Sequence, residues 1–399
     1  MNNRRSSPST ASEQTILVII TGDDRPGITA GALDVIGSAG AQVDDVEQTV
    51  TRRKLSLSIV VRVPPGRDLV KELLLFGWEQ QVHLDFEVVD QAPTPARPGL
   101  VITIVGTEIH PLEFAAVAAM CARKDCNIDR ITRLARTPVM AYELVVRGDR
   151  IDELKRNLLL AGRDLRCDLA VVHEGLAQRG ARLIVMDVDS TLIQNEMIDL
   201  LAHEADKLHE VAAVTDQAMK GDMDFEESLI ERVAHLKGLP ESAIDLARQR
   251  VELTPGAPTF IRTLSALGYR TAIVSGGFTA ITRSLADDLG IDYAFANTLE
   301  VEDGYLTGRV VGDLIDRERK AELVRELARK EGISVEQVVA IGDGANDLGM
   351  LEAAGLGIAF NAKPVVQDAA DTTLSVPYLD AILFMLGVNR DHIEAAGLA

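Results

Sequence analysis

The sequence has few cysteines, few aromatic residues and a deficit of positive charge. Aromatic residues make up only 4%, and three cysteines occur in 399 residues, Cys121, Cys126 and Cys167. This odd number, at a spacing that resembles no zinc site, fits reduced core thiols better than a disulfide framework. Acidic residues number 61 against 41 lysines and arginines, so the formal charge is -20. That charge argues against a protein that coats nucleic acid or an anionic membrane.

Long hydrophobic runs are also missing. No apolar run approaches the roughly 18 to 20 residues that a membrane helix needs, so we expect a protein that does not span a membrane. The reduced thiols favour a cytoplasmic location. The composition is otherwise that of a folded protein with a sizeable core, with 47% hydrophobic and 26% charged residues. The length predicts two or three domains.

The first part of the chain carries the same order of elements twice. Residues 14–93 alternate strand-like and helix-like patterns in the order βαββαβ, and residues 99–175 repeat this order. A Pro-rich linker, 94–98, separates the two copies, and residues 1–13 are predicted to be a disordered tail. We therefore expect two ferredoxin-like units from an internal duplication, which favours ligand or subunit interfaces over chemistry.

The turn Asp24-Arg25-Pro26-Gly27 of the first copy resembles the corresponding turn of ACT domains, small regulatory modules that bind amino acids. The resemblance implies an effector site at Asp24 and Gly27, and pairing of these ACT-like domains in a homodimer. Ordinary turn and helix-start chemistry is the alternative for Pro26 and Gly27. The second copy reads Thr107-Glu108-Ile109-His110 and lacks this Asp and Gly, so dimerisation is an equal alternative to ligand binding there.

Residues 180–399 have the pattern of an α/β protein with a Rossmann-like parallel sheet. The apolar run 183–186 reads as a buried strand and ends in two acids, Asp187 and Asp189. A strand followed by a plain helix cap is the alternative for this stretch alone. Only helical patterns fill the segment before the next strand near Thr271. That crossover exceeds one helix and predicts a helical cap over about residues 196–262.

Polar residues follow two further strands of this predicted sheet. Ser275, Gly276 and Gly277 follow one strand, and Asp343, Asn346 and Asp347 follow another, with Lys320 near the start of an intervening helix. Because ligands of parallel sheets bind at the carboxyl ends of strands, we expect these groups to meet. Carboxylates suit Mg²⁺, a hydroxyl with glycine amides suits phosphate, and lysine offsets charge in phosphoryl transfer. The second of two neighbouring acids can serve as general acid and base to the first.

This set of motifs resembles the haloacid dehalogenase superfamily of aspartyl-phosphate phosphotransferases over residues 183–390. The resemblance implies that Asp187 is the nucleophile and Asp189 the general acid/base. It further implies Mg²⁺ ligands in Asp187, the backbone carbonyl of Asp189, and Asp343. The implied phosphate and substrate contacts are Ser275, Gly276, Gly277, Lys320 and Asn346, while Asn346 and Asp347 orient the groups around the metal.

Within this superfamily the narrower resemblance is to the enzymes that hydrolyse phosphoserine. It implies that Glu196 and Arg232 bind the ammonium and carboxylate of O-phosphoserine, and that Met219 and Phe225 shape the pocket. Arginine offers a carboxylate the two-pronged fork that lysine lacks. Without the resemblance, plain surface charge on cap helices is the favoured interpretation of Glu196 and Arg232.

The expected activity is Mg²⁺-dependent hydrolysis of O-phosphoserine, the last step of serine synthesis, with serine as a candidate effector of the ACT-like domains. Two alternatives stay open at this point. One is a phosphatase or phosphomutase of the same superfamily that acts on a sugar phosphate. The other is an amino-acid-sensing regulatory protein whose phosphatase unit is residual, although the intact set of motif residues argues against it.

Overall fold

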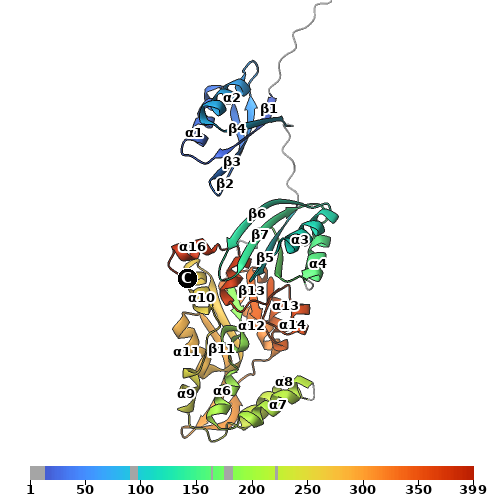
Figure 1. Cartoon of the computed structure of the whole chain (residues 1–399). Coiled ribbons are helices and arrows are strands. Elements are labelled where there is room, and N and C mark those ends of the chain that lie inside the picture. The colour runs from blue at the N-terminus through green and yellow to red at the C-terminus, as the bar shows by residue number, and fades with distance from the viewer. Residues whose placement is uncertain (1–13, 90–97, 163–164, 175–182, 221–222) are drawn as a thin grey trace, which may run out of the picture. The chain divides into compact units, whose positions relative to one another are not determined.

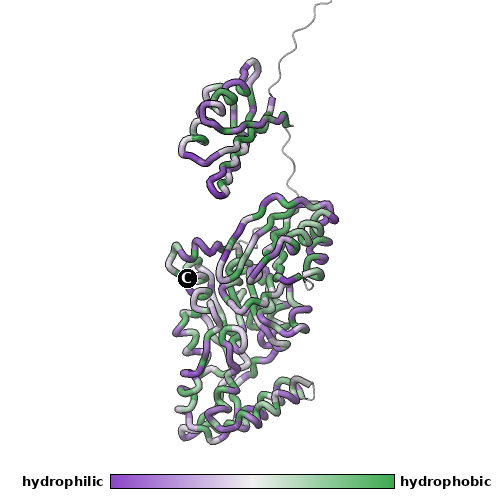
Figure 2. The backbone as a smooth tube through the Cα atoms, in the orientation of Figure 1, coloured by the Kyte–Doolittle hydropathy of each residue, from purple (hydrophilic) through white to green (hydrophobic). Residues whose placement is uncertain are grey.

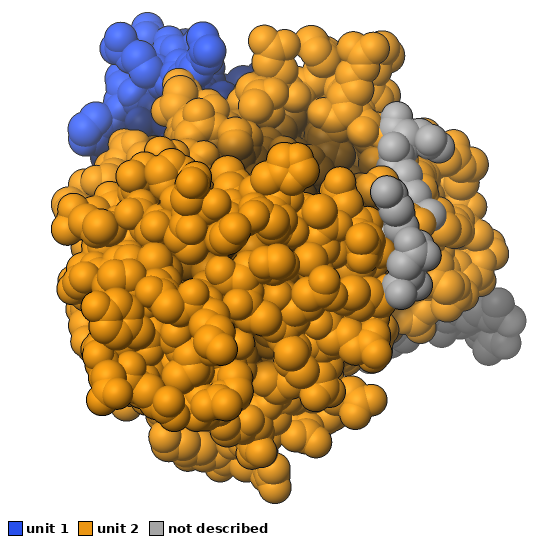
Figure 3. Space-filling view, turned by 90° about the horizontal axis from the view of Figure 1, so that it is seen from below, with its two compact units in different colours: residues 1–96 blue, residues 97–399 orange. Residues whose placement is uncertain are grey.

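The computed structural model describes residues 14–89, 98–162, 165–174, 183–220 and 223–399 (Figure 1). The chain divides into two compact units, residues 1–96 and 97–399, coloured separately in Figure 3. The expected tail 1–13 and all but the last residue of the expected linker 94–98 lie outside the described residues.

The first unit is a four-stranded antiparallel sheet with two helices on one face. Its elements are β1 (Gln14–Asp23), α1 (Ile28–Ser38), β2 (Gln42–Thr51), β3 (Lys54–Val63), α2 (Leu69–Gln80) and β4 (His83–Val88). The strand order is β2-β3-β1-β4. Alternate residues of β1 and β3, such as Val18, Ile20, Leu57 and Ile59, are fully buried in the core formed with the helices. This alternation is typical of a sheet with one covered face.

The second unit begins with a repeat of the same topology. Its elements are β5 (Gly99–Gly106), α3 (Pro111–Arg123), β6 (Asn127–Ala135), β7 (Met140–Arg147), α4 (Ile151–Gly162) and β8 (Asp168–His173), with strand order β6-β7-β5-β8. The prediction of two ferredoxin-like βαββαβ folds is thereby confirmed. Unlike β1, β5 is buried along its whole length. Its second face is covered, because Val105 and Ala141 share a hydrophobic cluster with residues near the C-terminus.

A seven-stranded sheet forms the centre of the larger α/β domain. Its strands are β9 (Leu183–Met186), β10 (Arg270–Phe278), β11 (Tyr293–Glu302), β12 (Tyr305–Val311), β13 (Val338–Gly342), β14 (Leu356–Phe360) and β15 (Thr372–Leu374). The order is β12-β11-β10-β9-β13-β14-β15, and only β12 is antiparallel to its neighbour. β9 is thus central, and its run of four buried apolar residues belongs to the hydrophobic interior visible in Figure 2. The predicted Rossmann-like parallel sheet is confirmed.

Helices cover both faces of this sheet. In β9, Ile184 and Met186 point to the cluster that contains α10 (Ala257–Ala266) and α11 (Thr279–Leu289). Leu183 and Val185 point to the cluster that contains α12 (Arg317–Glu331), α13 (Leu348–Ala353) and α14 (Pro364–Ala369). Because β9 is buried on both sides, its side chains are apolar until the strand ends at Asp187.

The long crossover between β9 and β10 is helical, as its sequence pattern predicts. It contains α6 (Met197–Glu204), α7 (Leu208–Lys220), α8 (Phe225–Ala234) and α9 (Ala243–Gln249). The two chain segments that lead into and out of this cap pair with each other. Ile193 and Leu253 form an isolated antiparallel bridge, and Thr254 Oγ1 donates to the carbonyl oxygen of Thr191 at 2.7 Å. None of the described helices combines the length and apolar character needed to span a bilayer.

The C-terminal segment ties the second βαββαβ fold to the α/β domain. α15 (Ile382–Met385) packs on β5, and α16 (Arg390–Ala395) packs on β6. At the sheet edge, Thr372 Oγ1 donates to the carbonyl oxygen of Leu169 at 2.7 Å, and the Ser375 amide donates to Asp168 Oδ2 at 2.8 Å. These contacts explain why the second copy belongs to the same compact unit as the α/β domain.

Candidate active site

The end of β9 places Asp187 beside a buried lysine. The Asp187 amide continues the pairing with β13 by donating to the Ile341 carbonyl at 2.9 Å, and the residue is 4% exposed. Lys320, in the first turn of α12, donates from Nζ to Asp187 Oδ1 at 2.8 Å and to Asp347 Oδ1 at 2.7 Å. The neighbouring strand ends therefore meet, as predicted, and Lys320 reaches between them.

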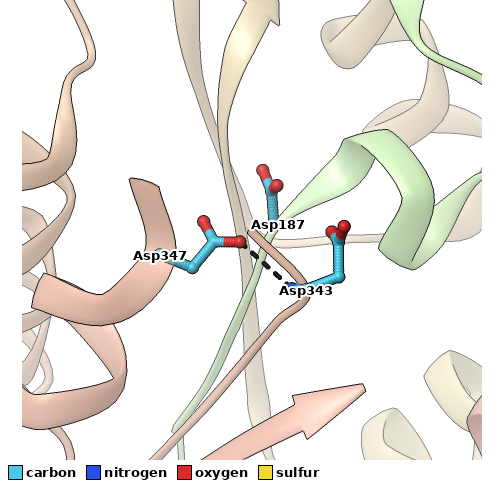
Figure 4. A group of neighbouring side chains, drawn as sticks. All are labelled: Asp187, Asp343 and Asp347. Carbon is cyan, nitrogen blue, oxygen red and sulfur yellow. Dashed lines mark hydrogen bonds between the residues drawn. The ribbon is translucent and has the colours of Figure 1, made fainter. Parts of the chain in front are cut away.

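Three carboxylates from two strand ends form the centre of the site. Asp187, Asp343 and Asp347 each offer an oxygen within 4.8 Å of the others, and Figure 4 shows them converging from β9 and from the turn after β13. Asp347 Oδ2 accepts hydrogen bonds from the amides of Asp343 and Gly344 at 3.1 and 3.0 Å. Asp347 therefore uses both carboxylate oxygens, Oδ1 to bind Lys320 and Oδ2 to hold the turn. Asp187 and Asp343 keep oxygens that a ligand could bind.

Asp189 is held by contacts from the cap and from β10. Its Oδ1 accepts the amide hydrogen of Met197, at the start of α6, at 2.7 Å. Its Oδ2 accepts the Ser275 hydroxyl at 2.9 Å, and Ser275 Oγ in turn accepts the Gly277 amide at 2.7 Å. A Cβ on Gly277 would lie 3.0 Å from Asp189 Oδ2 and 2.3 Å from the Met197 side chain, so a larger residue would have to displace these groups and glycine leaves room for them.

The electrostatics of these groups indicate an excess of negative charge. Burial, with the charge of Glu196, raises the pKa of Asp189 to about 7. Burial, with the charge of Asp347, raises the pKa of Asp343 to about 7 and the pKa of Asp187 well above its usual range. Burial alone would lower the pKa of Lys320, but Asp187 and Asp347 outweigh it and raise that pKa. Hard oxygen donors with uncompensated negative charge fit a divalent cation.

A cleft of about 360 Å³ lies above this centre. It collects most of the residues that the sequence predicts for the site: Asp187, Asp189, Glu196, Phe225, Arg232, Gly276, Gly277, Asp343 and Asn346. Three further predicted residues are fully buried around the floor of the cleft: Ser275, Lys320 and Asp347. Ser275 contacts Asp189 and Lys320 contacts Asp187, so they affect the cleft through these two acids. Met219 lies in α7, and its side chain is outside the described residues.

The cap supplies the two charged residues predicted to bind an amino acid. Glu196 immediately precedes α6, and its Oε1 accepts the Ser190 hydroxyl at 2.8 Å. Arg232 lies on α8, one face of which also brings Phe225 and Leu229 to the cleft. The Arg232 Nε donates to the Ser228 carbonyl at 3.2 Å, so the outer nitrogens of the guanidinium are not used by that bond.

The structure also brings residues to the site that the sequence interpretation missed. Asp199 and Thr215 of the cap and Lys363, before α14, line the same cleft. Asn297 of β11 is buried beneath it, where Nδ2 donates to the Gly276 carbonyl at 2.8 Å and Oδ1 accepts the Ile315 amide at 2.9 Å. Because Lys363 follows the end of β14, the pattern of polar residues after strands that identified the other site residues also points to it.

The predicted effector residues belong to the first unit. Asp24 and Gly27 are exposed on the turn between β1 and α1. The Asp24 amide donates to the Arg53 carbonyl at 2.8 Å, and Gly27 starts α1 with a φ of 100°.

Comparison with known families agrees with this architecture. A family model described as haloacid dehalogenase-like hydrolase matches residues 184–352, and two ACT domain models match residues 14–87 and 99–172. The fold and site thus define a haloacid dehalogenase-like hydrolase preceded by two ACT domains.

Relatives that match nearly the whole chain identify the family within this class. A phosphoserine phosphatase from Streptomyces coelicolor is 49% identical over 98% of this chain and 96% of its own. Phosphoserine phosphatase SerB2 from Mycobacterium tuberculosis is 44% identical over 96% of this chain and 95% of its own. This chain belongs to the phosphoserine phosphatase family.

Two solved structures share much of the fold. The unliganded crystal structure of a probable phosphoserine phosphatase from Vibrio cholerae is 34% identical, with a TM-score of 0.57, and the match covers 75% of this chain and 89% of that one. A haloacid dehalogenase family hydrolase from Salmonella enterica serovar Typhi is 30% identical, with a TM-score of 0.63, and the match covers 72% and 98%.

Proposed function

We propose that this protein hydrolyses O-phospho-L-serine to L-serine and phosphate, the last step of serine synthesis. The observation that carries the proposal is one cleft that joins two kinds of group. Asp187, Lys320 and Asp343 at its floor suit phosphoryl transfer, while Glu196 and Arg232 in the cap suit the ammonium and carboxylate of an amino acid.

In the proposed mechanism an oxygen of Asp187 attacks the phosphorus atom. A bond from Asp187 to phosphorus forms as the bond from phosphorus to the serine oxygen breaks, and Asp189 gives its proton to that oxygen. Asp189 then takes a proton from water, whose oxygen attacks phosphorus and releases phosphate and free Asp187. A pKa of about 7 suits Asp189 to both proton transfers near neutral pH.

The remaining residues have supporting roles in this proposal. Asp187, Asp343 and the backbone carbonyl of Asp189 would hold Mg²⁺, which neutralises phosphate charge when bound. Lys320 fixes Asp187 and offsets negative charge at the floor of the cleft. Ser275, the Gly276 amide, Gly277 and Asn346 are the proposed phosphate contacts, with Phe225 and Met219 as apolar walls; the Gly277 amide itself holds Ser275 Oγ. Asn346 and Asp347 keep the surrounding groups oriented.

The ACT domains support regulation by an amino acid, and we propose the product serine as effector, near Asp24 and Gly27. Homodimerisation through the ACT domains is part of the same proposal, supported by the open edge strand β2, where Val43, Val46 and Val50 are exposed. Activity of the full chain across a serine titration, compared with Asp24→Ala, tests the effector site. Sedimentation at several concentrations tests the dimer.

We place the reaction in the cytoplasm, because Cys121, Cys126 and Cys167 are free and buried, which fits a reducing compartment.

Steady-state assays of phosphate release with O-phospho-L-serine and with sugar phosphates test the activity. The proposal expects a strong preference for phosphoserine that Arg232→Ala reduces. Equal turnover of sugar phosphates, unchanged in Arg232→Ala, would favour a different substrate.

A further inference from the structure

The carboxylate of Asp343 is held by a single hydroxyl group. Among the described residues its only hydrogen-bond donor is Thr191, whose Oγ1 lies 3.0 Å from Asp343 Oδ1. Asp187, the other carboxylate predicted to bind the metal, is instead fixed by the buried ammonium group of Lys320. The direction of the Asp343 carboxylate therefore depends on where the Thr191 hydroxyl lies.

Thr191 is held in turn by a residue that follows the cap in the sequence. It is fully buried in the segment that leads into the cap, and its carbonyl oxygen accepts the Thr254 hydroxyl at 2.7 Å. Thr254 is buried as well, in the segment that leads out of the cap. Because a β-branched side chain has little χ1 freedom, a fixed Thr191 backbone also fixes the Thr191 hydroxyl. Two hydrogen bonds thus connect Thr254 to Asp343.

Backbone pairing joins the same two segments along their length. The Gln194 amide donates to the Glu252 carbonyl at 2.8 Å. The Thr254 amide donates to the Leu192 carbonyl at 3.0 Å. The side chain of Asn195 adds a further bond, since its Oδ1 accepts the Glu252 amide at 2.7 Å. A displacement of the segment that leaves the cap would therefore displace the segment that carries Thr191.

The Thr254 hydroxyl has no role in starting the helix that follows it. A hydroxyl at a helix start usually accepts one of the first amide hydrogens of that helix. α10 begins instead after Gly256, which has a φ of 82°, and no side chain caps it. The Thr254 hydroxyl donates to the other segment, so helix capping does not account for it.

We propose that Thr254 is a positioning residue for the metal site, because it fixes Thr191 and through it the carboxylate of Asp343. This inference rests on the proposed function, in which Asp343 is a ligand of Mg²⁺. Loss of a group that orients a metal ligand typically weakens metal binding by about 10- to 100-fold. Neither threonine is among the proposed substrate contacts, so the effect should appear in Mg²⁺ affinity and not in substrate recognition.

Calorimetric titration of the full chain with Mg²⁺, without substrate, tests the assignment. Thr254→Val removes the hydroxyl and keeps the shape, whereas Thr254→Ser keeps the hydroxyl. Thr263→Val is the matched control, since Thr263 is also buried and its hydroxyl has no hydrogen-bond partner among the described residues. We expect Thr254→Val to raise the Mg²⁺ dissociation constant about 10-fold, and Thr254→Ser and Thr263→Val to match wild type. An unchanged constant in folded Thr254→Val, or an equal rise in Thr263→Val, would overturn the proposal.

A double-mutant cycle tests whether Thr254 acts through Thr191. Thr191→Val removes the bond to Asp343 directly and should raise the Mg²⁺ dissociation constant at least as much as Thr254→Val does. In the Thr191→Val background, Thr254→Val should then have little further effect, because both changes break one connected chain of bonds. Fully additive effects of the two changes would contradict this route from Thr254 to the metal site.

Two further measurements separate positioning from a loss of folding. At saturating Mg²⁺, the KM for O-phospho-L-serine in Thr254→Val should equal the wild-type value, and a raised KM would contradict the proposal. If Thr254→Val does not fold, Asn195→Ala decides, since Asn195 is half-buried and joins the same two segments. It should raise the Mg²⁺ dissociation constant about 3-fold, and an unchanged constant would refute the coupling.

Failure of the proposed function is visible separately. Wild type that binds Mg²⁺ without hydrolysing O-phospho-L-serine would refute that function, while the calorimetric comparison of the variants still decides the role of Thr254. Wild type that binds no Mg²⁺ would refute both the metal site and this inference.

Discussion

Lys320 Nζ lies 2.8 Å from Asp187 Oδ1, and both side chains are almost completely buried. The same ammonium group lies 2.7 Å from Asp347 Oδ1. Two buried carboxylates thus depend on one lysine for neutralisation, and removing it would leave them unpaired in a dry site.

Lys320→Met should therefore lose both activity and stability. We expect kcat to fall by about 10²- to 10³-fold and the free energy of unfolding by about 3–5 kcal/mol. Steady-state kinetics and thermal melting would measure the two effects. Arg325→Met, on the exposed face of the same helix, is the control and should change neither. Wild-type stability in Lys320→Met would contradict the described ion pairs.

Asn297 couples the glycine loop to the segment before α12, since it bonds both the Gly276 carbonyl and the Ile315 amide. Asn297→Asp keeps the acceptor but turns the donor toward Gly276 into a second acceptor. We expect kcat/KM to fall by about 10- to 100-fold, because the loop amides lose their position against phosphate. Thr298→Ala, at the exposed neighbouring position, should behave as wild type. Unchanged kinetics in Asn297→Asp would show that the loop is held by other contacts.

Removal of divalent cations should abolish activity, because the acids at the floor of the cleft then repel a phosphate ester. Treatment with a chelator and readdition of Mg²⁺, followed by phosphate release, measures this. Mg²⁺ at about 100 times its dissociation constant should also stabilise the fold by about 2.7 kcal/mol. Asp343→Asn should lose that stabilisation. Full activity after exhaustive chelation would contradict the proposed requirement for a divalent cation.

Asp168, where the second ACT domain meets the α/β domain, should make stability depend on pH. Burial raises its pKa to about 6, above the usual 3.8, although the Ser375 amide opposes the rise. Since the folded state holds this proton more tightly than the unfolded state, the stabilisation is present below about pH 4 and is lost as pH rises through about 6.

Asp168→Asn should remove this component, because an amide oxygen still accepts the Ser375 amide without carrying charge. The wild-type melting temperature should fall relative to that of Asp168→Asn as pH rises from about 4 to 7, with a total effect of about 3 kcal/mol for a shift of about two pKa units. Parallel curves for the two proteins would show that Asp168 does not titrate there.

Much of this site follows from local sequence. The apolar run before Asp187 has no polar position, because β9 is buried on both faces, and its end is therefore conspicuous. Asp343 follows the end of β13 for the same reason, and Ser275 lies in β10 just beyond Ile273, the last β10 residue that pairs with β9. Parallel pairing then brings three such ends together without any further information.

Other parts depend on tertiary contacts that no local pattern encodes. Asp199 and Lys363 resemble ordinary surface charges, and only the folded cap and β14 bring them to one cleft. Asn297 lies inside a strand, where its partners are set by β10 and the approach to α12. Similarly, the patterns of β1 and β5 do not reveal that a C-terminal segment covers β5.

The most direct test of the central claim is phosphate release from O-phospho-L-serine with Mg²⁺ by wild type and by Asp187→Asn. The variant keeps the shape of the side chain but loses the nucleophilic oxygen. We predict steady turnover by wild type and a loss of at least about 10⁴-fold in the variant. Wild type without phosphoserine turnover, or a variant that retains it, would contradict the account.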